Sequence, residues 1–536
     1  MQNTKKLLSI SNLKKYFPVA KSSIFQKQQL YVRANEEITL DIYQGETLGV
    51  VGESGCGKST LGRVLLQLYP QTAGTTIYYG STLQDTAPAY VLDTLKNLEK
   101  YKKKLAAATK KAADLDKKVE AAGGEEKADF YLLQNRNLAR CEEQSCLTNI
   151  VKIMGGFTVH DPDNKGRNLL LEQYKLNVKR KSVKEKYIAV RLEHDHIANM
   201  PAEEVKAKLA KKRDGLKVKM DALDKELSAV AAEVAAVNAK LDALRAQYAG
   251  NAEFDRHEAM LDDGIDLARL KYNEMRLFRK DLQIIFQDPY SSLNPRMTIG
   301  QIIEEGLVTH NFFKAGSQKM RDHIVKTMVE CGLQEYMLHR YPHQFSGGQR
   351  QRVAIARALA VEPKFIVCDE CVSALDVSIQ SQIINLLQEL REKQNLTYMF
   401  ISHDLSVVRY ISDRICVMYL GNIVELGDAK TVFEDPRHPY TVALLSSIPT
   451  TDQDSANKER ILLEGNIPSP IKPPAGCKFH TRCYMACDKC KRVPPELKEI
   501  EPGHFVACHF DQKKIDEKGN YLFELPKMER KSNRGE

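Results

Sequence analysis

The sequence predicts an α/β fold that a long helical insertion interrupts and a small cysteine-rich extension follows. Residues 46–51 form a short apolar run that leads into a glycine-rich turn and then an apolar helix, which is the strand, loop and helix order of many α/β folds. Residues 84–265 are rich in Lys, Glu and Ala, whereas residues 431–536 are rich in Pro and Cys. We therefore divide the chain into a core of residues 1–83 and 266–430, an inserted domain and a C-terminal extension.

The length and composition of the chain limit the kinds of protein that it can be. The chain has 536 residues, a formal net charge of +9, 43% hydrophobic residues and 28% charged residues. Single cores rarely exceed about 250–300 residues, so more than one folding unit is expected. No run approaches the roughly 18–20 apolar residues that cross a bilayer, and the first residues lack the apolar stretch of a secretion signal. We expect a cytoplasmic protein that reaches a membrane through partners, and the mild positive charge does not require a nucleic acid.

The core contains several short strand-like runs. Residues 8–13 and 39–43 are expected to be strands near the start of the chain. Residues 282–286, 365–368 and 398–401 are apolar runs between helical stretches, as in a buried sheet. Strands that alternate with helices favour a parallel sheet with helices on its faces.

The glycine-rich turn matches the pattern G-x-x-x-x-G-K-[ST]. Its glycines let backbone N–H groups turn toward phosphate oxygens, and the helix that follows directs its positive end at them. The Lys reaches the β and γ phosphates and the Ser ligates Mg²⁺. The residues expected to bind ATP here are Gly52, Glu53, Ser54, Gly55, Cys56, Gly57, Lys58, Ser59 and Thr60.

A pair of acids ends the strand at residues 365–368. Hydrolysis of a phosphate needs a carboxylate that holds the metal and a group that orients the attacking water. Asp369 is the candidate for the Mg²⁺ shell, and Glu370 is the candidate general base.

A short motif before the acids identifies a family. The letters SGGQ within HQFSGGQRQRVAIARAL resemble the signature of ATP-binding-cassette (ABC) ATPases. The resemblance implies that two subunits sandwich two nucleotides, with each signature contacting the γ-phosphate that the other subunit's loop holds. An anion is favoured there because the motif opens a helix. The residues of this motif are Ser346, Gly347, Gly348 and Gln349.

The same resemblance assigns four further residues. Gln287 in FQDPY resembles the Q-loop residue that touches Mg²⁺ and senses the membrane partner, and Asp376 in SALD resembles the D-loop. His403 in ISHD resembles the switch histidine that contacts the γ-phosphate. Tyr16 and Phe17 compete as the aromatic that stacks on adenine, and we favour Phe17. Where many relatives have proline after the paired acids this chain has Cys371, which removes no catalytic group.

The C-terminal part narrows the family further. HPYT, ALLSSIP and LEGNIPSP resemble the extension of oligopeptide and dipeptide importer ATPases, and GESGCGKSTLGR and FQDPYSSLNPRMTIG are similar to its F-type subunit. The resemblance covers residues 1–83 and 266–510. It implies peptide import, a second homologous ATPase subunit, two transmembrane permease subunits and an extracytoplasmic peptide-binding protein. It places the chain at the cytoplasmic face of the inner membrane.

Five of the twelve cysteines lie between positions 477 and 508. In a cytosolic chain such a group indicates a metal site more than a disulfide framework. The family's extension is similar to ones that carry a [4Fe–4S] cluster, which needs four thiolates; zinc also accepts four. Cys487 is an additional thiol in the same loop. The cysteines that match the family's spacing are Cys477, Cys483, Cys490 and Cys508.

The insertion has no counterpart in the family. Apolar residues at alternating steps of three and four form seams over residues 98–119 and 209–248, which predicts coiled coil. We expect an antiparallel hairpin in which these seams pair and the residues between them form a small head. Its role and its partner are open.

A coiled-coil ABC ATPase that acts on DNA is the alternative, since Cys141 and Cys146 lie between the seams like a metal hook. Their C-x₄-C spacing is too wide for that hook, the insertion precedes Gln287 and the importer-like tail has no place in such proteins, so no nucleic acid is expected.

Overall fold

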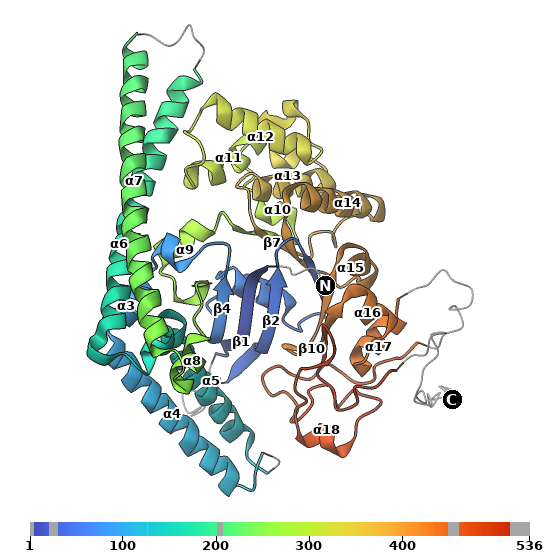
Figure 1. Ribbon diagram of the computed structural model, residues 1–536. Coiled ribbons are helices and arrows are strands. Elements are labelled where there is room, and N and C mark those ends of the chain that lie inside the picture. Colours follow the sequence, from blue (N-terminus) through green and yellow to red (C-terminus); the bar gives the residue numbers. More distant parts are fainter. Residues whose placement is uncertain (1–4, 21–29, 126, 201–206, 449–459, 515–536) are drawn as a thin grey trace.

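The computed structural model describes residues 5–20, 30–125, 127–200, 207–448 and 460–514, and Figure 1 shows their arrangement. A body built on two sheets carries a long helical column along one side. No helix of these ranges is long and apolar enough to cross a membrane.

The central sheet has eight strands in the order β11-β12-β10-β9-β3-β8-β7-β6 within the described ranges. Its parallel part, from β9 to β6, is built from mainly apolar runs, and every residue of β3, β7 and β8 is buried. Three of these strands match the runs expected near residues 282–286, 365–368 and 398–401. The bounds of this parallel part are β3 Thr47–Val51, β6 Leu282–Ile285, β7 Phe365–Asp369, β8 Thr397–Ile401 and β9 Arg414–Tyr419.

Both faces of this sheet are covered. Ile366 and Val367 are neighbours on β7 and point into different apolar clusters, as strand geometry requires. The Ile366 cluster lies under helices of the second half of the core, and the Val367 cluster includes α1 and a smaller sheet. The helices of the core, taken over both faces of the sheet, are α1 Lys58–Leu65, α9 Tyr272–Phe278, α10 Pro289–Ser292, α11 Ile299–Thr309, α12 Gln318–Glu330, α13 Gly347–Leu359, α14 Val377–Gln394, α15 Leu405–Ile411 and α16 Ala429–Glu434. The 3-10 turns of the core are at Leu267–Arg269, Glu335–His339 and Pro342–Gln344.

The smaller sheet is antiparallel and holds the base of the insertion. Its order is β2-β1-β4-β5. The chain leaves the sheet after β4 and returns at β5, which pairs with β4 at Ile77↔Asp266 and Tyr78↔Ile265. The inserted helices therefore start and end at adjacent points of one sheet edge. The strands are β1 Lys6–Pro18, β2 Tyr31–Tyr43, β4 Ala73–Tyr78 and β5 Ile265–Asp266.

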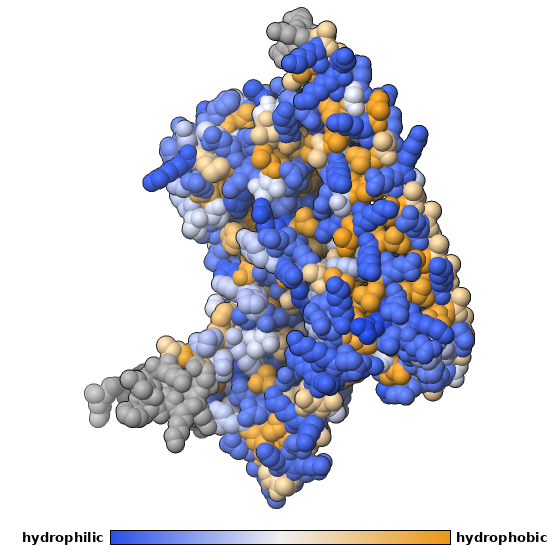
Figure 2. Space-filling model, turned by 90° about the vertical axis from the view of Figure 1, so that its left-hand side faces the viewer, coloured by the Kyte–Doolittle hydropathy of each residue, from blue (hydrophilic) through white to orange (hydrophobic). Residues whose placement is uncertain are grey.

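The inserted helices pair differently from the expectation. α4 packs on α5 and α6 packs on α7, so the predicted pairing of the seams at residues 98–119 and 209–248 is wrong. Each seam lies against the helix nearest to it along the chain, because a short connection favours antiparallel neighbours. Figure 2 shows the outer face of this region, which is mostly hydrophilic with apolar side chains between. The elements are α2 Leu83–Thr86, α3 Ala89–Lys96, α4 Leu98–Ala121, α5 Phe130–Met154, α6 Lys165–Ala198, α7 Ala207–Tyr248 and α8 Ala252–Glu258, with 3-10 turns at Gly155–Thr158 and Pro162–Asn164.

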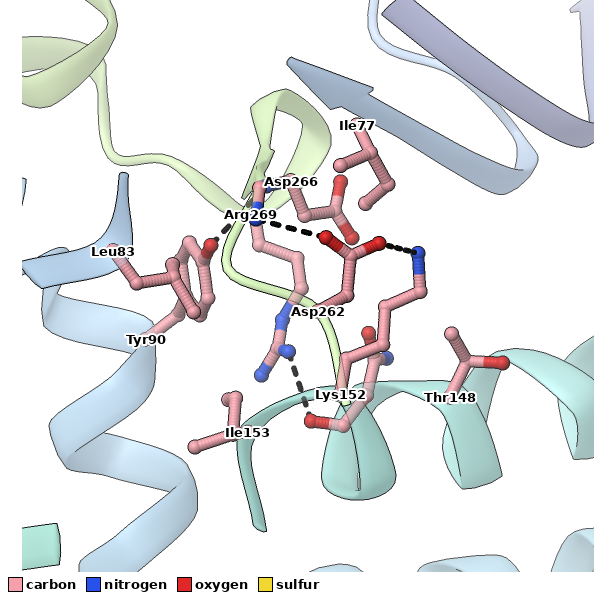
Figure 3. A pocket seen from close by; sticks show the side chains of 11 residues that line it. Ile77, Leu83, Tyr90, Thr148, Lys152, Ile153, Asp262, Asp266 and Arg269 are labelled. Carbon is pink, nitrogen blue, oxygen red and sulfur yellow. Dashed lines mark hydrogen bonds and ion pairs between the residues drawn. The ribbon is translucent and has the colours of Figure 1, made fainter. Parts of the chain in front are cut away.

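A polar cluster fixes α5 to the sheet edge (Figure 3). Lys152 on α5 forms an ion pair of 3.1 Å with Asp262, which precedes β5. Arg269 donates to the Thr94 hydroxyl over 2.8 Å, and its other terminal nitrogen reaches the Asn149 carbonyl. Burial raises the pKa of Asp266 to about 6, although Arg269 opposes that shift.

The C-terminal extension continues the central sheet. β12 pairs antiparallel with β10, so two strands of the extension join the core. The carboxylate of Glu425 on β10 is fully buried and accepts from the N–H groups of Arg437 and His438 and from His504 Nε2 at 2.8–3.0 Å. These bonds fasten two separate segments of the extension, at residues 437–438 and at residue 504, to one strand. The core strand β10 spans Asn422–Asp428. The elements of the extension are α17 Pro439–Ser446, α18 Asp488–Arg492, β11 Lys498–Glu501 and β12 His504–Val506.

Candidate functional site

The glycine-rich turn runs from the end of β3 to α1. Gly57 caps α1 at φ 103°, a left-handed conformation that glycine adopts without strain. A Cβ there would lie 2.1 Å from the Ala34 carbonyl oxygen, and one at Gly52 would lie 2.2 Å from that of Met418. The neighbouring backbone therefore admits only glycine at both positions. Ser54 and Gly55 are exposed at the tip of the turn, Cys56 is buried, and Thr60 is half-buried on α1.

Lys58 lies folded over this turn. Its side chain is buried, and Nζ donates to the carbonyl oxygens of Gly52 over 2.7 Å and Glu53 over 3.1 Å. The ammonium group thus lies against two carbonyl oxygens of the turn that is expected to bind phosphate.

Ser59 and Asp369 connect the turn to the end of β7. The Ser59 hydroxyl donates to Oδ1 of Asp369 over 2.5 Å, and Arg63 lies 3.3 Å from Oδ2. Asp369 is only 3% exposed. A hydroxyl and a carboxylate at hydrogen-bonding distance are hard oxygen donors of the kind that Mg²⁺ takes, so the residues fit that metal.

Glu370 is held by two neighbouring segments, one at the end of β8 and one after β6. Its backbone has φ 49°, and its N–H donates to the Ile401 carbonyl on β8 over 3.0 Å. Gln287 donates from Nε2 to Oε2 of Glu370 over 3.1 Å, and Nδ1 of His403 lies 3.4 Å from the same oxygen. The structure thus brings together three residues that were selected separately in the sequence.

The two candidate aromatics for adenine differ in availability. Tyr16 is buried, and its hydroxyl donates to Glu36 over 2.8 Å. Phe17 is half-buried, meets Tyr69 edge-on at 5.5 Å between ring centroids and has Lys15 Nζ at 4.6 Å from its ring. Of the two rings, that of Phe17 is the more accessible.

The SGGQ motif opens α13. Ser346 is the N-cap, where its hydroxyl accepts from Gln349 N–H and its own N–H donates to Gln349 Oε1. A Cβ at Gly348 would lie 2.5 Å from Ile379 of α14, whereas Gly347 has more room. Ser346 and Asp376, which caps α14, are both exposed. α13 packs on the helices α10, α11, α12 and α14. In contrast, α1 packs on the strands β2, β7 and β8, so the SGGQ motif and the glycine-rich turn lie on elements with different neighbours.

Comparisons with known proteins agree with this geometry. The family model described as "ABC transporter" matches residues 35–229 and 241–373. The chain belongs to the ABC transporter family. A second family model, "Oligopeptide/dipeptide transporter, C-terminal region", matches residues 424–490 of this ABC ATPase.

Two curated relatives are similar to slightly less than half of this ABC ATPase. AppF of Bacillus subtilis (strain 168), an oligopeptide transport ATP-binding protein, is 52% identical over 252 residues, which cover 47% of this chain and 76% of AppF. OppF of Salmonella typhimurium (strain LT2), also an oligopeptide transport ATP-binding protein, is 54% identical over 246 residues, 46% of this chain and 73% of OppF. Neither relative's name refers to DNA, so these comparisons do not support the alternative of a coiled-coil ABC ATPase that acts on DNA.

The four predicted cysteine ligands lie in one region of the ABC ATPase. Burial raises the pKa of Cys477 to about 11 and that of Cys483 to about 12, and the thiols of Cys490 and Cys508 contribute to both shifts. Cys487 Sγ lies 3.6 Å from Cys490 Sγ. Among the residues that the structure describes, no group of three or more Cys, His, Asp or Glu side chains is arranged to hold a metal ion. Four thiols are the donor set that a [4Fe–4S] cluster or zinc takes, so these residues fit such a group in the chemistry of their side chains.

Three residues at the site of the ABC ATPase were not selected from its sequence. Arg63 contacts Asp369, Tyr440 contacts Glu53, and Arg482 pairs with Glu53. Tyr440 lies in the HPYT motif and Arg482 directly precedes Cys483, so both belong to motifs already noted. Nothing in those motifs indicates that they reach the glycine-rich turn.

Proposed function

We propose that this ABC ATPase energises the import of peptides across a bacterial inner membrane. The convergence of Gln287, Glu370 and His403 beside the Ser59–Asp369 pair carries the catalytic part of the proposal. The likeness to AppF and OppF and the matched C-terminal region support the choice of peptides.

Each residue of the site has a proposed role. Glu370 is the general base that takes a proton from the attacking water, and His403 orients the γ-phosphate. The glycine-rich turn with Lys58 and Thr60 holds the phosphates, and Phe17 stacks on adenine. Ser59, Gln287 and Asp369 would hold Mg²⁺, which when bound neutralises charge on the β and γ phosphates.

A second ATPase subunit completes each site. The exposed Ser346, at the start of α13, and the exposed Asp376 suit contact with nucleotide across a subunit interface. We propose a homologous ATPase partner, two transmembrane permease subunits and an extracytoplasmic peptide-binding protein that delivers cargo. The chain would lie at the cytoplasmic face of the membrane.

We propose that α6 and α7 form a coiled-coil arm within the inserted domain of residues 84–265. The buried residues of α7 follow steps of four, three and four from Val230 through Val234 and Val237 to Leu241. The nucleotide site does not use this arm, so we assign it to binding a further partner.

Cys477, Cys483, Cys490 and Cys508 are proposed to hold a [4Fe–4S] cluster, with zinc as the alternative. Cys490 and Cys508 contribute to the raised pKa of both Cys477 and Cys483, which supports a site that four thiolates would complete. The group would stabilise a segment with little apolar core of its own.

The decisive experiment is affinity purification of the full chain from its native membrane in mild detergent, with the bound proteins identified by mass spectrometry. Recovery of two polytopic membrane proteins and a second ABC ATPase, with ATP hydrolysis by the complex, is expected. An additional stoichiometric protein would identify the partner of the arm. Recovery from the soluble fraction with DNA-associated proteins would refute the transport proposal.

A further inference from the structure

A salt bridge joins the cysteine-rich extension to the phosphate-binding turn. Nη1 of Arg482 lies 2.7 Å from Oε2 of Glu53, and Nη2 lies 3.0 Å from Oε1. Two parallel charged hydrogen bonds fix both the position and the orientation of the carboxylate. We propose that Arg482 is a positioning residue that holds Glu53 and thereby sets the affinity of the turn for nucleotide.

The backbone of Glu53 is held from the same side. Its N–H donates to the hydroxyl oxygen of Tyr440 over 2.8 Å. Tyr440 is fully buried, and its ring packs against Tyr419 and Phe479 at centroid distances of 4.9 and 5.3 Å. Glu53 also offers its carbonyl oxygen to Lys58 over 3.1 Å, so the extension is two contacts away from the phosphate-binding lysine.

The negative charge of Glu53 makes its contact with Arg482 important for nucleotide binding. Glu53 puts a carboxylate into a turn that would receive the anionic phosphates of ATP, and such a charge opposes anion binding unless it is neutralised. Arg482 supplies that neutralisation, with its side chain 6% exposed against 25% for Glu53. Loss of Arg482 would therefore leave an unpaired negative charge beside the phosphates and free the turn to move.

The cysteine loop sets the position of Arg482. The N–H of Arg482 donates to the Phe479 carbonyl over 3.0 Å, and Cys483 is the next residue in the chain. Cys477 N–H donates to the Cys490 carbonyl over 2.8 Å, which closes the loop. If this loop strengthens nucleotide binding, nucleotide binding strengthens the loop to the same degree, because coupling between two sites is reciprocal.

The test measures binding of a fluorescent ATP analogue to the full chain, and this inference rests on the proposed nucleotide binding. Arg482→Ala should raise Kd about tenfold, the factor that corresponds to 1.4 kcal/mol. Arg482→Lys keeps the charge but loses the bidentate geometry, so its Kd should be intermediate. In the assembled complex KM should rise while kcat stays within about twofold, because the pair acts on binding. Lys491→Ala removes an exposed cation from the same extension and should change nothing.

A double variant separates positioning from loss of structure. Glu53→Gln combined with Arg482→Ala removes the repulsive charge together with its partner, so it should bind the analogue more tightly than Arg482→Ala alone. Should Arg482→Ala fail to fold, Tyr440→Phe provides the second test, since it keeps the packed ring, loses the acceptor and should still weaken binding. Wild-type affinity in a folded Arg482→Ala or Tyr440→Phe protein would overturn the inference, as would equal loss in Lys491→Ala. A wild-type chain that binds no analogue would instead refute the proposed function.

Discussion

Gln287 donates a hydrogen bond to Glu370 although 83 positions separate them in the chain, with Nε2 lying 3.1 Å from Oε2. The same oxygen lies 3.4 Å from Nδ1 of His403, which follows a third strand. The carboxylate is therefore oriented from two sides, while its backbone adopts a left-handed conformation at φ 49°. Such a conformation in a non-glycine residue is costly and persists where the surrounding contacts over-determine it.

Glu370→Gln should abolish most turnover and leave nucleotide binding intact. The amide keeps the size of the side chain and can still accept from Gln287, but it cannot take a proton from water. General bases contribute about 10²–10⁴-fold, so steady-state hydrolysis by the assembled complex should fall at least about 100-fold. Glu392→Gln makes the same chemical change at an exposed position of α14 and should leave the rate unchanged. Unaltered hydrolysis in Glu370→Gln would remove the assignment.

Phe17→Ala should weaken nucleotide binding without changing the rate at saturation. Stacking of a base on an aromatic ring contributes about 1–3 kcal/mol, so Kd for ATP should rise about 5- to 150-fold. Tyr16→Ala is the matched comparison, because it removes the competing ring, and Tyr16→Phe controls for the loss of the hydrogen bond to Glu36 alone. Titration of the Phe17→Ala and Tyr16→Ala variants with a fluorescent nucleotide decides between the two aromatics. A larger rise in Kd for Tyr16→Ala, with Tyr16→Phe unchanged, would assign adenine to Tyr16.

Strands β3, β6, β7 and β8 of the central sheet were predictable because each is a mainly apolar run bounded by polar residues, whereas β9 was not predicted. The expected run at residues 365–368 is β7, which ends at Asp369. The helix pairing was not predictable in the same way. A seam of apolar residues shows that a helix has a partner, but the seams at residues 98–119 and 209–248 carry no mark of which helix that partner is.

The contact between Glu53 and Arg482 shows a second limit. These residues are 429 positions apart, and no periodicity relates a turn in the core to a loop in the extension. The sequence motifs identify both segments: they predict phosphate binding by the glycine-rich turn and metal binding by the cysteine-rich loop. Their meeting depends on β12 adding to the central sheet and on Glu425 fastening the extension, which are tertiary events without a local pattern.

Cys483→Ser should release the metal that the extension is proposed to hold. Four thiolates are required, so loss of one should reduce the bound iron of the purified chain from about four per molecule, or the bound zinc from about one. Elemental analysis of anaerobically purified protein distinguishes the two metals. Cys146→Ser replaces a buried cysteine of the inserted helices and should retain the wild-type metal content. A wild-type chain with neither metal would contradict the prediction.

Asp266→Asn should stabilise the protein at pH 7.5 and not at pH 4. Burial raises the pKa of Asp266 from 3.8 to about 6, against the opposing effect of Arg269. A group whose pKa is raised on folding contributes stability that is complete below pH 3.8 and is lost as the pH rises through 6. Asparagine stays neutral and keeps an oxygen that can accept from Ala268 N–H, so it avoids this loss, which is at most about 3 kcal/mol at 1.36 kcal/mol per pKa unit.

Thermal unfolding of the wild type and the variant at both pH values measures the difference, with exposed Asp263→Asn as the control that should show none. The prediction is contradicted if the Tm of Asp266→Asn falls equally at both pH values. Removal of the charge would then bring no stability at pH 7.5, and the Asp266 carboxylate itself would be needed to fix α5 to the sheet edge at β5.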